Sequence, residues 1–382
     1  MSRREASPLD KREKLKLLAR AAQYDLCASC GTHSARVRDE IGHWIFPAAL
    51  PDGRHVALLK VLQSNACEND CFYCANRRSR NTTRCDLAPE ELAWSFTELV
   101  RTRRAEGLFL SSAICRDTTR TMAQMIATVE LVRQKYEFRG YIHLKLLPGT
   151  DEATIERAVQ LADRVSVNLE APSAARLERL SGDKRFDQQL MQPLKSAGRL
   201  RDAGLGARAG LTTQFVVGGA GESDAEILGT VAQLYRELRL RRAYYSAFQP
   251  VPLTPLQDLP ATSPLREHRL YQSDFLLRQY GFDLADIPLD PAGNLSLVHD
   301  PKLGWALAHP ERFPIEVNKA CQEELLRVPG IGPVSARRII LLRATNRPTC
   351  LEHLAAIGVA EKRAAPYITI NGRRPPQQLS LF

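Results

Sequence analysis

Three cysteines, Cys67, Cys71 and Cys74, stand in one short segment with the spacing C-x3-C-x2-C. Thiolates are the protein ligands of iron–sulfur clusters, and a four-iron cluster usually takes one thiolate on each iron. Three thiolates in one loop can therefore hold three irons and leave the fourth without a protein ligand. An iron with an open position can bind a small molecule and pass it an electron, so the spacing predicts a redox-active cluster.

Two other interpretations of these cysteines are a zinc loop and three unrelated thiols. Zinc sites usually pair two C-x2-C units or add a histidine, and no such partner stands at a matching spacing from residues 67–74. Unrelated buried thiols would not need to share one hydrophilic loop, so we favour the cluster. A separate pair, Cys27 and Cys30, could form half of a second metal site with Cys85 and Cys115, but we favour incidental cysteines there.

The composition is that of a globular chain, with 382 residues, 44% hydrophobic and 25% charged, which favours two or three domains. No apolar run is long enough to span a bilayer, and the first residues lack the apolar core of a signal peptide. We therefore expect a cytoplasmic protein with no membrane partner. Thiols stay reduced in that compartment, so cysteines there indicate metal binding or catalysis before disulfides.

The charge distribution favours a polyanionic partner. The net charge is +10, and residues 321–382 contain nine Lys and Arg against four Asp and Glu. A second basic focus, Arg77, Arg78, Arg80 and Arg84, follows the cysteine loop. It is either a solvated face, which is the usual outcome for such a run, or a phosphate contact beside the cysteines.

Short apolar segments alternate with helix-like segments through the middle of the chain. Such alternation predicts an α/β fold in which right-handed crossovers build a parallel sheet, closed or partly closed into a barrel. The chemistry of such barrels lies at the carboxyl ends of the strands, and the cysteines directly follow the first strand. The expected strands are residues 56–62, 107–110, 141–146, 165–169, 211–217 and 243–248.

The cysteine spacing, the strand before it and the aromatic Tyr73 before the last cysteine resemble the signature of the radical S-adenosylmethionine (SAM) enzymes. The resemblance covers about residues 44–262 and implies a partial (β/α)6 barrel. It also implies a [4Fe–4S] cluster on the three cysteines, with SAM bound to the open iron through its amino and carboxylate groups. An external donor would reduce the cluster, and SAM would then yield a 5′-deoxyadenosyl radical.

The same resemblance implies which strand ends bind the cofactor. Many members carry Gly-Gly-Glu where this chain has Ser111 and Ser112, so that contact differs here. Lys145 could pair with a carboxylate or phosphate, or lie on the surface. Cys115 could donate a hydrogen atom to a substrate radical, as a cysteine does in spore photoproduct lyase, although we favour an uninvolved thiol. The implied cofactor-binding residues are Tyr73, Ser111, Ser112, Asn168, Glu170, Gln214, Gly218 and Gly219.

A second motif lies near the C-terminus, where a helix ends at Val328 and Pro333 begins the next one. Gly330 and Gly332 between them let backbone N–H groups turn outward, which makes an anion site at a helix N-terminus. Such a site grips phosphate without reading sequence. A degenerate copy follows at residues 356–363, with Ala356 in place of the first glycine.

This motif resembles the helix-hairpin-helix of DNA-repair proteins. The implied DNA-binding residues are Gly330, Ile331, Gly332, Arg337 and Arg338. An ordinary helical hairpin is the alternative, and RNA is the rival polyanion.

The last residues, Gln378, Leu379, Leu381 and Phe382, resemble the short motif by which bacterial replication and repair proteins dock on the sliding clamp. Leucine and phenylalanine can fill an apolar pocket while the glutamine amide fixes orientation. The alternative is a disordered apolar end.

The order of these modules resembles the DNA modification/repair radical SAM proteins, a family found with a uracil-DNA-glycosylase-like protein. The resemblance implies an enzyme that repairs or modifies a nucleotide in DNA, single-stranded or flipped out of the duplex. The alternatives are a radical SAM enzyme acting on RNA, a non-enzymatic DNA-binding iron–sulfur protein, and an enzyme acting on a small metabolite.

The implied division of the chain is an N-terminal helical extension at 1–45, the barrel at 46–262, a connector at 263–320, a small all-α helix-hairpin-helix module at 321–371, and a flexible tail at 372–382.

Overall fold

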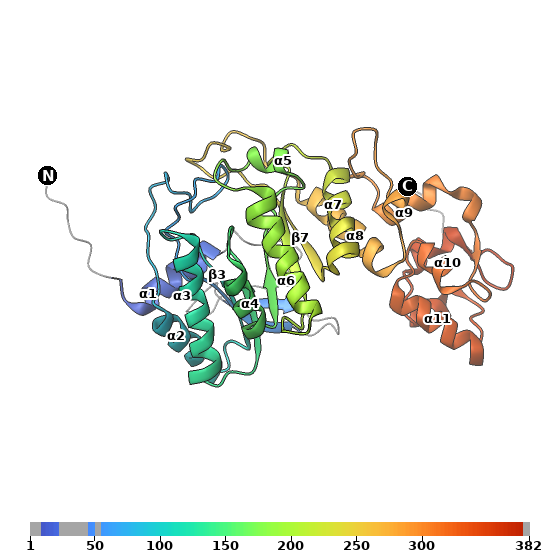
Figure 1. Cartoon of the computed structure of the whole chain (residues 1–382). Coiled ribbons are helices and arrows are strands. Elements are labelled where there is room, and N and C mark those ends of the chain that lie inside the picture. The colour runs from blue at the N-terminus through green and yellow to red at the C-terminus, as the bar shows by residue number, and fades with distance from the viewer. Residues whose placement is uncertain (1–8, 23–44, 50–54, 377–382) are drawn as a thin grey trace. The chain divides into compact units, whose positions relative to one another are not determined.

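The computed structural model of the chain describes residues 9–22, 45–49 and 55–376 (Figure 1). Cys27, Cys30 and the tail residues Gln378, Leu379, Leu381 and Phe382 lie outside the described residues. The chain divides into two compact units. The barrel unit comprises Met1–Glu222 with Gln233–Glu267, and the C-terminal unit comprises Ser223–Ala232 with His268–Phe382.

The barrel unit contains one sheet of seven strands in sequence order, and its last six strands are parallel. This confirms the predicted α/β fold and all six predicted strands. The first and last strands in the order do not pair with each other, so among the described residues the sheet is an open half-barrel. The strands are β1 (Ile45–Ala49), β2 (His55–Leu62), β3 (Gly107–Ser111), β4 (Tyr141–Lys145), β5 (Arg164–Ser166), β6 (Leu211–Val217) and β7 (Arg242–Ala247).

The strand interiors are largely buried, as parallel strands covered by other elements require. In β6 six of seven residues are buried, and Phe215 stacks on Tyr245 of β7 with ring centroids 6.4 Å apart. Six parallel strands therefore share a continuous core, and their carboxyl ends meet at one edge of the sheet.

One strand was not predicted from the sequence, and another ends three residues before its predicted end. β1, which pairs antiparallel to β2, was missed because Pro47 removes a backbone donor, and proline is tolerated only at a sheet edge. β5 ends at Ser166 instead of residue 169. Beyond it the Thr213 hydroxyl accepts a hydrogen bond from the Leu169 N–H (3.1 Å) and donates to the Val167 carbonyl (2.8 Å). A side chain thus replaces the regular ladder and leaves an irregular strand end.

Helices connect the consecutive parallel strands from β2 to β7. In Figure 1, α2, α3, α4 and α6 lie side by side along one face of the sheet. The helix before the sheet begins with a capping box, in which Asp10 accepts from the Glu13 N–H and Glu13 from the Asp10 N–H. The helices are α1 (Lys11–Ala21), α2 (Pro89–Arg101), α3 (Thr118–Glu130), α4 (Glu152–Leu161), α5 (Ala174–Glu178), α6 (Gln192–Asp202) and α7 (Asp224–Leu238), with π-helical turns η4 (Leu131–Lys135) and η5 (Phe186–Met191).

Helices α10 to α13 contribute to a separate core that includes Leu325, Ile331, Ile339 and Leu354. This part also contains a two-stranded parallel pair, β8 (Ile315–Glu316) and β9 (Ile368–Thr369), which the sequence analysis did not predict. No described helix is long and apolar enough to cross a membrane. The remaining helices are α8 (Pro264–Gln279), α9 (Pro301–Ala308), α10 (Gln322–Arg327), α11 (Pro333–Thr345), α12 (Leu351–Ala356) and α13 (Glu361–Ala364), with 3-10 turns η6 (Leu284–Asp286), η7 (Pro310–Arg312) and η8 (Ala365–Tyr367).

Candidate functional site

A cavity of about 980 Å³ lies at the carboxyl ends of the parallel strands in the barrel unit. We call it the cysteine cavity. It brings together the three cysteines of one loop and polar residues from the ends of β3, β5 and β6. The residues predicted from the sequence that line it are Cys67, Cys71, Cys74, Tyr73, Ser111, Ser112, Asn168, Glu170 and Gln214.

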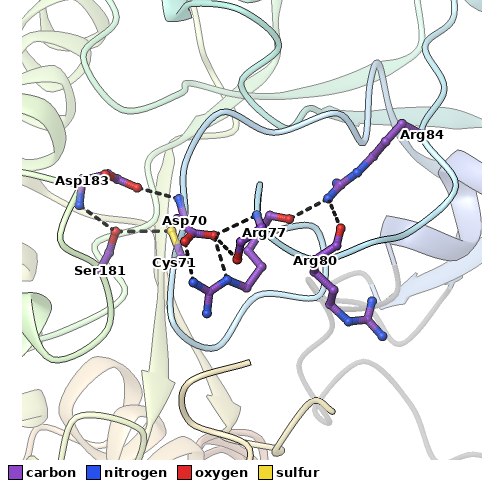
Figure 2. A network of polar contacts seen from close by, with 8 residues as sticks. Asp70, Cys71, Arg77, Arg80, Arg84, Ser181 and Asp183 are labelled. Carbon is purple, nitrogen blue, oxygen red and sulfur yellow. Dashed lines mark hydrogen bonds and ion pairs between the residues drawn. The ribbon is translucent and has the colours of Figure 1, made fainter. Parts of the chain in front are cut away.

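The cysteine loop is fixed from both sides by the contacts shown in Figure 2. Asp70 receives two hydrogen bonds from the buried Arg77 guanidinium, at 2.7 and 2.6 Å. Its backbone N–H donates to Asp183 (2.5 Å), and the Cys71 thiol lies 3.4 Å from the Ser181 hydroxyl. The Arg77 hydrogen bonds hold the pKa of Asp70 well below its usual range. The loop is therefore held by charge-assisted hydrogen bonds, which are stronger than neutral ones.

Three arginines of the basic run after the cysteines, Arg77, Arg80 and Arg84, make structural contacts within the chain. Arg84 donates to four backbone carbonyls of the same loop, those of Asn65, Asn76, Arg77 and Arg80, at 2.5 to 2.9 Å (Figure 2 shows the last two). Arg80 donates to the carbonyls of Pro252 and Ala75 at 3.1 and 3.0 Å. These arginines satisfy buried carbonyls and hold the shape of the loop, while Arg78 is exposed.

The thiols are half-buried or buried and lie beside a positive charge. Burial raises the pKa of Cys67, and it raises the pKa of Cys74 to about 12. The Cys74 sulfur accepts a hydrogen bond from the Asn76 N–H at 3.4 Å. Such N–H···S contacts tune the potential of iron–sulfur clusters.

An ion pair between Lys184 and Glu170 (3.1 Å) closes this side of the cavity, and both side chains are nearly buried. Burial alone would lower the pKa of Lys184. The negative charges of Cys71 and Glu170 outweigh it and hold that pKa above its usual value. Burial also raises the pKa of Tyr73, with the Glu170 charge adding to it, so Tyr73 remains a neutral phenol.

The donor set fits a cluster better than a single ion. Across residues 9–22, 45–49 and 55–376, no group of three or more His, Cys, Asp or Glu side chains converges as a metal ion requires. A cluster places its thiolates on separate irons, which suits three thiols spread along the wall of one cavity. Lys184 adds a positive charge beside them, which favours thiolates.

Three residues predicted as functional do not line the cysteine cavity. The N–H groups of Gly218 and Ala220 donate to the carboxylate of Glu222, so the turn closes on itself. Gly218 has a φ of +88°, and a Cβ there would lie 2.1 Å from the Thr262 hydroxyl, so packing alone accounts for the glycine. Gly219 is likewise packed against Leu180 and Phe248.

Cys115 is the third of these residues. Its backbone N–H donates to the Thr121 hydroxyl (3.0 Å), which in turn donates to the Cys115 carbonyl (2.9 Å).

The cavity also contains charged side chains. The sequence had singled out Arg80 in the basic run and Lys145 at the end of β4, whereas no motif indicated Lys184 and Glu267. Lys184 follows α5 in a loop without a recognisable pattern, and only the fold carries that loop to the cysteines. Loop residues of this kind have no sequence signal.

In the C-terminal unit the predicted hairpin is present between α10 and α11. Gly330 has a φ of +88°, and a Cβ there would lie 2.7 Å from the Ala360 carbonyl oxygen. Gly332 precedes Pro333 as the N-cap of α11. The buried Lys302 ammonium donates to the Ile331 carbonyl (2.5 Å), and burial lowers the pKa of Lys302 to about 7.

The second hairpin has a different register from the one predicted. Gly358, with a φ of +90°, matches Gly330, so Ala360 replaces the second glycine and Ala356 does not replace the first. The two turns contact each other directly, because the Ala360 N–H donates to the Gly330 carbonyl at 2.9 Å. The prediction was wrong because the left-handed backbone that defines the matching glycine is not visible in the letters.

Side chains join the two hairpins as well. Ser335 donates to the Gly358 carbonyl (2.7 Å) and Arg338 to the Ile357 carbonyl (3.1 Å). One predicted DNA-binding arginine, Arg338, therefore has a structural contact, while Arg337 is exposed on α11. The helix after the second turn, α13, has only four residues.

No protein-family model matches the chain, and no curated protein matches its sequence. Solved structures of similar arrangement include methylornithine synthase (PylB), at 18% identity and a TM-score of 0.47, covering 72% of this chain and 74% of that one. The [FeFe]-hydrogenase maturase HydG from Carboxydothermus hydrogenoformans matches at 13% identity and a TM-score of 0.47, over 58% of this chain and 51% of HydG.

The radical SAM methyltransferase TsrM from Kitasatospora setae, solved with cobalamin and a [4Fe–4S] cluster, matches at 14% identity and a TM-score of 0.42. That match covers 53% of this chain and 36% of TsrM. The aligned part thus spans about half of HydG and about a third of TsrM.

Proposed function

We propose that this chain is a radical SAM enzyme whose cluster is held by Cys67, Cys71 and Cys74. One observation carries the proposal: the three thiols share a single cavity with Tyr73 and polar strand ends, at the edge of the sheet where such barrels do their chemistry. When bound, a reduced [4Fe–4S] cluster supplies the electron that turns SAM into a source of the 5′-deoxyadenosyl radical.

The chain's own residues hold and shield this chemistry. Arg77 and Arg84 fix the loop that carries the thiols. Lys184 balances negative charge beside Cys71, and the ion pair with Glu170 places that charge without leaving a buried carboxylate unpaired. Ser111, Ser112, Asn168 and Gln214 offer uncharged hydrogen-bonding groups, which suits the amino, carboxylate and ribose groups of SAM.

We further propose that the substrate is a nucleotide in DNA. The basic excess of residues 321–382 and the paired hairpins support it. The N–H groups of the first turn of α11 and the exposed Arg337 would contact phosphate. A base inside a duplex cannot enter a cavity, so the target would be single-stranded or flipped out.

The enzyme proposal is tested anaerobically. The protein is reconstituted with iron and sulfide, reduced with dithionite and given SAM, and 5′-deoxyadenosine is quantified with no nucleic acid, with DNA and with RNA of the same sequence. We expect product from the native chain, stimulation by DNA, and none from Cys71→Ala. Cys350→Ala is the matched control, because that thiol lies far along the chain and does not line the cavity.

No product from a protein with a full cluster would sink the enzyme proposal in favour of a structural or redox cluster. Stimulation by RNA alone would move the substrate to RNA, and absence of any nucleic-acid effect would favour a small metabolite.

The hairpin is tested by a matched pair of glycine substitutions. Gly330→Ala places a Cβ 2.7 Å from the Ala360 carbonyl, whereas a Cβ on Gly358 meets nothing nearer than 3.5 Å, at the same backbone conformation. We expect Gly330→Ala to weaken DNA binding in a fluorescence titration much more than Gly358→Ala. Equal effects would show that the first turn has no special role.

Partners are proposed from the sequence. Residues 378–382 would dock on a sliding clamp, and a pull-down with a bacterial clamp should lose its signal when Leu381 and Phe382 are deleted. A uracil-DNA-glycosylase-like protein and an external electron donor are the other partners that this function requires or suggests, and the cytoplasm is the compartment in which they would meet.

A further inference from the structure

A second cavity, of about 470 Å³, lies at the opposite edge of the sheet, where β5, β6 and β7 begin. We call it the arginine pocket. It gathers residues from the start of β5, the loop between α6 and β6, and the segment between α7 and β7. Its lining residues are Arg164, Arg201, Asp202, Arg208, Ala209, Gly210, Arg239 and Arg241.

Two of the five arginines form its frame. Arg201 pairs with Asp202 (2.7 Å) and donates to the carbonyls of Leu238 (2.8 Å) and Arg239 (3.1 Å) at the end of α7. Arg164 donates to the Ala209 carbonyl from two nitrogens, at 3.2 and 2.9 Å. These contacts satisfy helix-end and loop carbonyls, the usual task of a cation at a helix C-terminus.

The other three arginines are not explained in this way. Arg208, Arg239 and Arg241 are exposed, and within the described part of the chain their guanidinium groups have no hydrogen bond or ion pair. Among the described residues that line the pocket the one carboxylate, Asp202, is already paired with Arg201. The frame therefore fixes the backbone that carries three unpaired guanidinium groups around one hollow, with an excess of four positive charges.

Guanidinium groups form planar, bidentate hydrogen bonds with phosphate, and crowded like charges repel each other until an anion joins them. We propose that the arginine pocket is a phosphate-binding site, with Arg208, Arg239 and Arg241 as its ligands. The phosphate could belong to the backbone of a nucleic-acid strand or to a small phosphorylated compound. The proposal does not depend on the cluster, so it goes beyond the proposed reaction.

The test compares two triple variants of the full-length protein. One replaces the ligands (Arg208→Gln, Arg239→Gln, Arg241→Gln). The matched control removes the same charge from three exposed arginines that line neither cavity (Arg103→Gln, Arg120→Gln, Arg139→Gln). Thermal melts confirm that both are folded. A labelled single-stranded oligonucleotide is titrated by fluorescence anisotropy at several salt concentrations, and pyrophosphate is titrated by calorimetry.

If the source is a nucleic-acid strand, the ligand variant should lower the slope of log Kobs against log salt by about 2, since each lost contact removes about 0.7. This decrease in slope corresponds to roughly 100-fold weaker oligonucleotide binding near 0.1 M salt. Loss of pyrophosphate binding with unchanged oligonucleotide binding would assign the pocket to a small phosphorylated ligand. Indistinguishable behaviour of the two triple variants with both probes would overturn the proposal.

A variant that keeps the positive charges separates the effect of bidentate guanidinium binding from the effect of charge alone. With lysines at the three positions, we expect the salt slope to be retained and the pyrophosphate affinity to fall, because an ammonium cannot bind in the bidentate mode. None of these measurements involves SAM or iron, so failure of this proposal is distinguishable from failure of the enzyme proposal.

Discussion

The two edges of the parallel sheet carry loops of opposite electrostatic design. At the carboxyl edge the buried cations beside the cysteines have fixed partners: Arg77 has Asp70, and Lys184 has Glu170. At the amino edge three arginines surround a hollow without a partner among the described residues. Paired charges hold the shape of the cysteine cavity, whereas unbalanced charges favour an incoming anion. The same sheet therefore supports a chemical site at one edge and a binding site at the other.

The largest expected effect is a separation of the two edges by mutation. Cys71→Ala should abolish iron binding and 5′-deoxyadenosine formation while leaving pyrophosphate binding unchanged. The triple replacement of Arg208, Arg239 and Arg241 with glutamine should abolish pyrophosphate binding and leave 5′-deoxyadenosine formation unchanged. Its iron content, measured by a colorimetric assay, should equal that of the native protein. If either variant impaired both properties, the two edges would be coupled and the comparison would fail.

A smaller effect concerns the balanced edge. Lys184→Met leaves the Glu170 carboxylate buried without its cation, at a cost of about 3 to 5 kcal/mol in the free energy of unfolding. The side chains of Lys184 and Glu170 are only 10% and 8% exposed, so water is a poor replacement for the lost partner. Denaturant unfolding of the cluster-free protein measures the change. Combining Lys184→Met with Glu170→Gln should restore most of the stability, and a single variant as stable as the native chain would contradict the assignment.

In the arginine pocket we expect the frame arginines to contribute to the free energy of unfolding and the ligand arginines to contribute little. Arg201→Met removes contacts to Asp202 and to two carbonyls, and should cost about 1 to 3 kcal/mol. Arg241→Gln, at an exposed guanidinium, should stay within about 0.5 kcal/mol of the native stability. Thermal or denaturant unfolding of both variants decides. Equal destabilisation would mean that Arg241 also belongs to the frame.

The smallest effect probes the layer between the edges, where His143 of β4 lies beside Ser166 (2.9 Å) and stands in register with Arg164. Burial, reinforced by the charges of Arg164, Lys60 and Lys145, lowers the pKa of His143 well below its usual value. The unfolded chain therefore binds the proton more readily, and stability falls as the pH drops below the ordinary histidine pKa of about 6.5.

The slope should be at most about 1.4 kcal/mol per pH unit, and His143→Gln should flatten it between pH 6.5 and 5. An unchanged pH profile in this variant would show that other groups are responsible.

Sequence reasoning reached further for the site than for the binding surfaces. The cysteines and the polar strand ends share a loop or follow apolar strands, so local order in the chain predicted their meeting in one cavity. Lys184 and Glu267 come from segments without a motif. The five arginines of the pocket are scattered over β5, α6 and the starts of β6 and β7, and only the return of parallel strands brings them together. The register of the second hairpin was missed for a related reason, since it depends on the φ of Gly358.

By itself the sequence determined the thiol triplet, the six parallel strands and the glycine-flanked turn, because each depends on spacing within a few residues and on strict backbone preferences. The tertiary structure decided which charged side chains make structural contacts and which do not. It assigned Arg77 and Arg84 to the interior of the cysteine loop, and it left Arg208, Arg239 and Arg241 at the opposite edge without partners among the described residues. A charged side chain gains a partner only from whatever the fold places within a few ångströms of it, and that distance is not encoded in neighbouring residues.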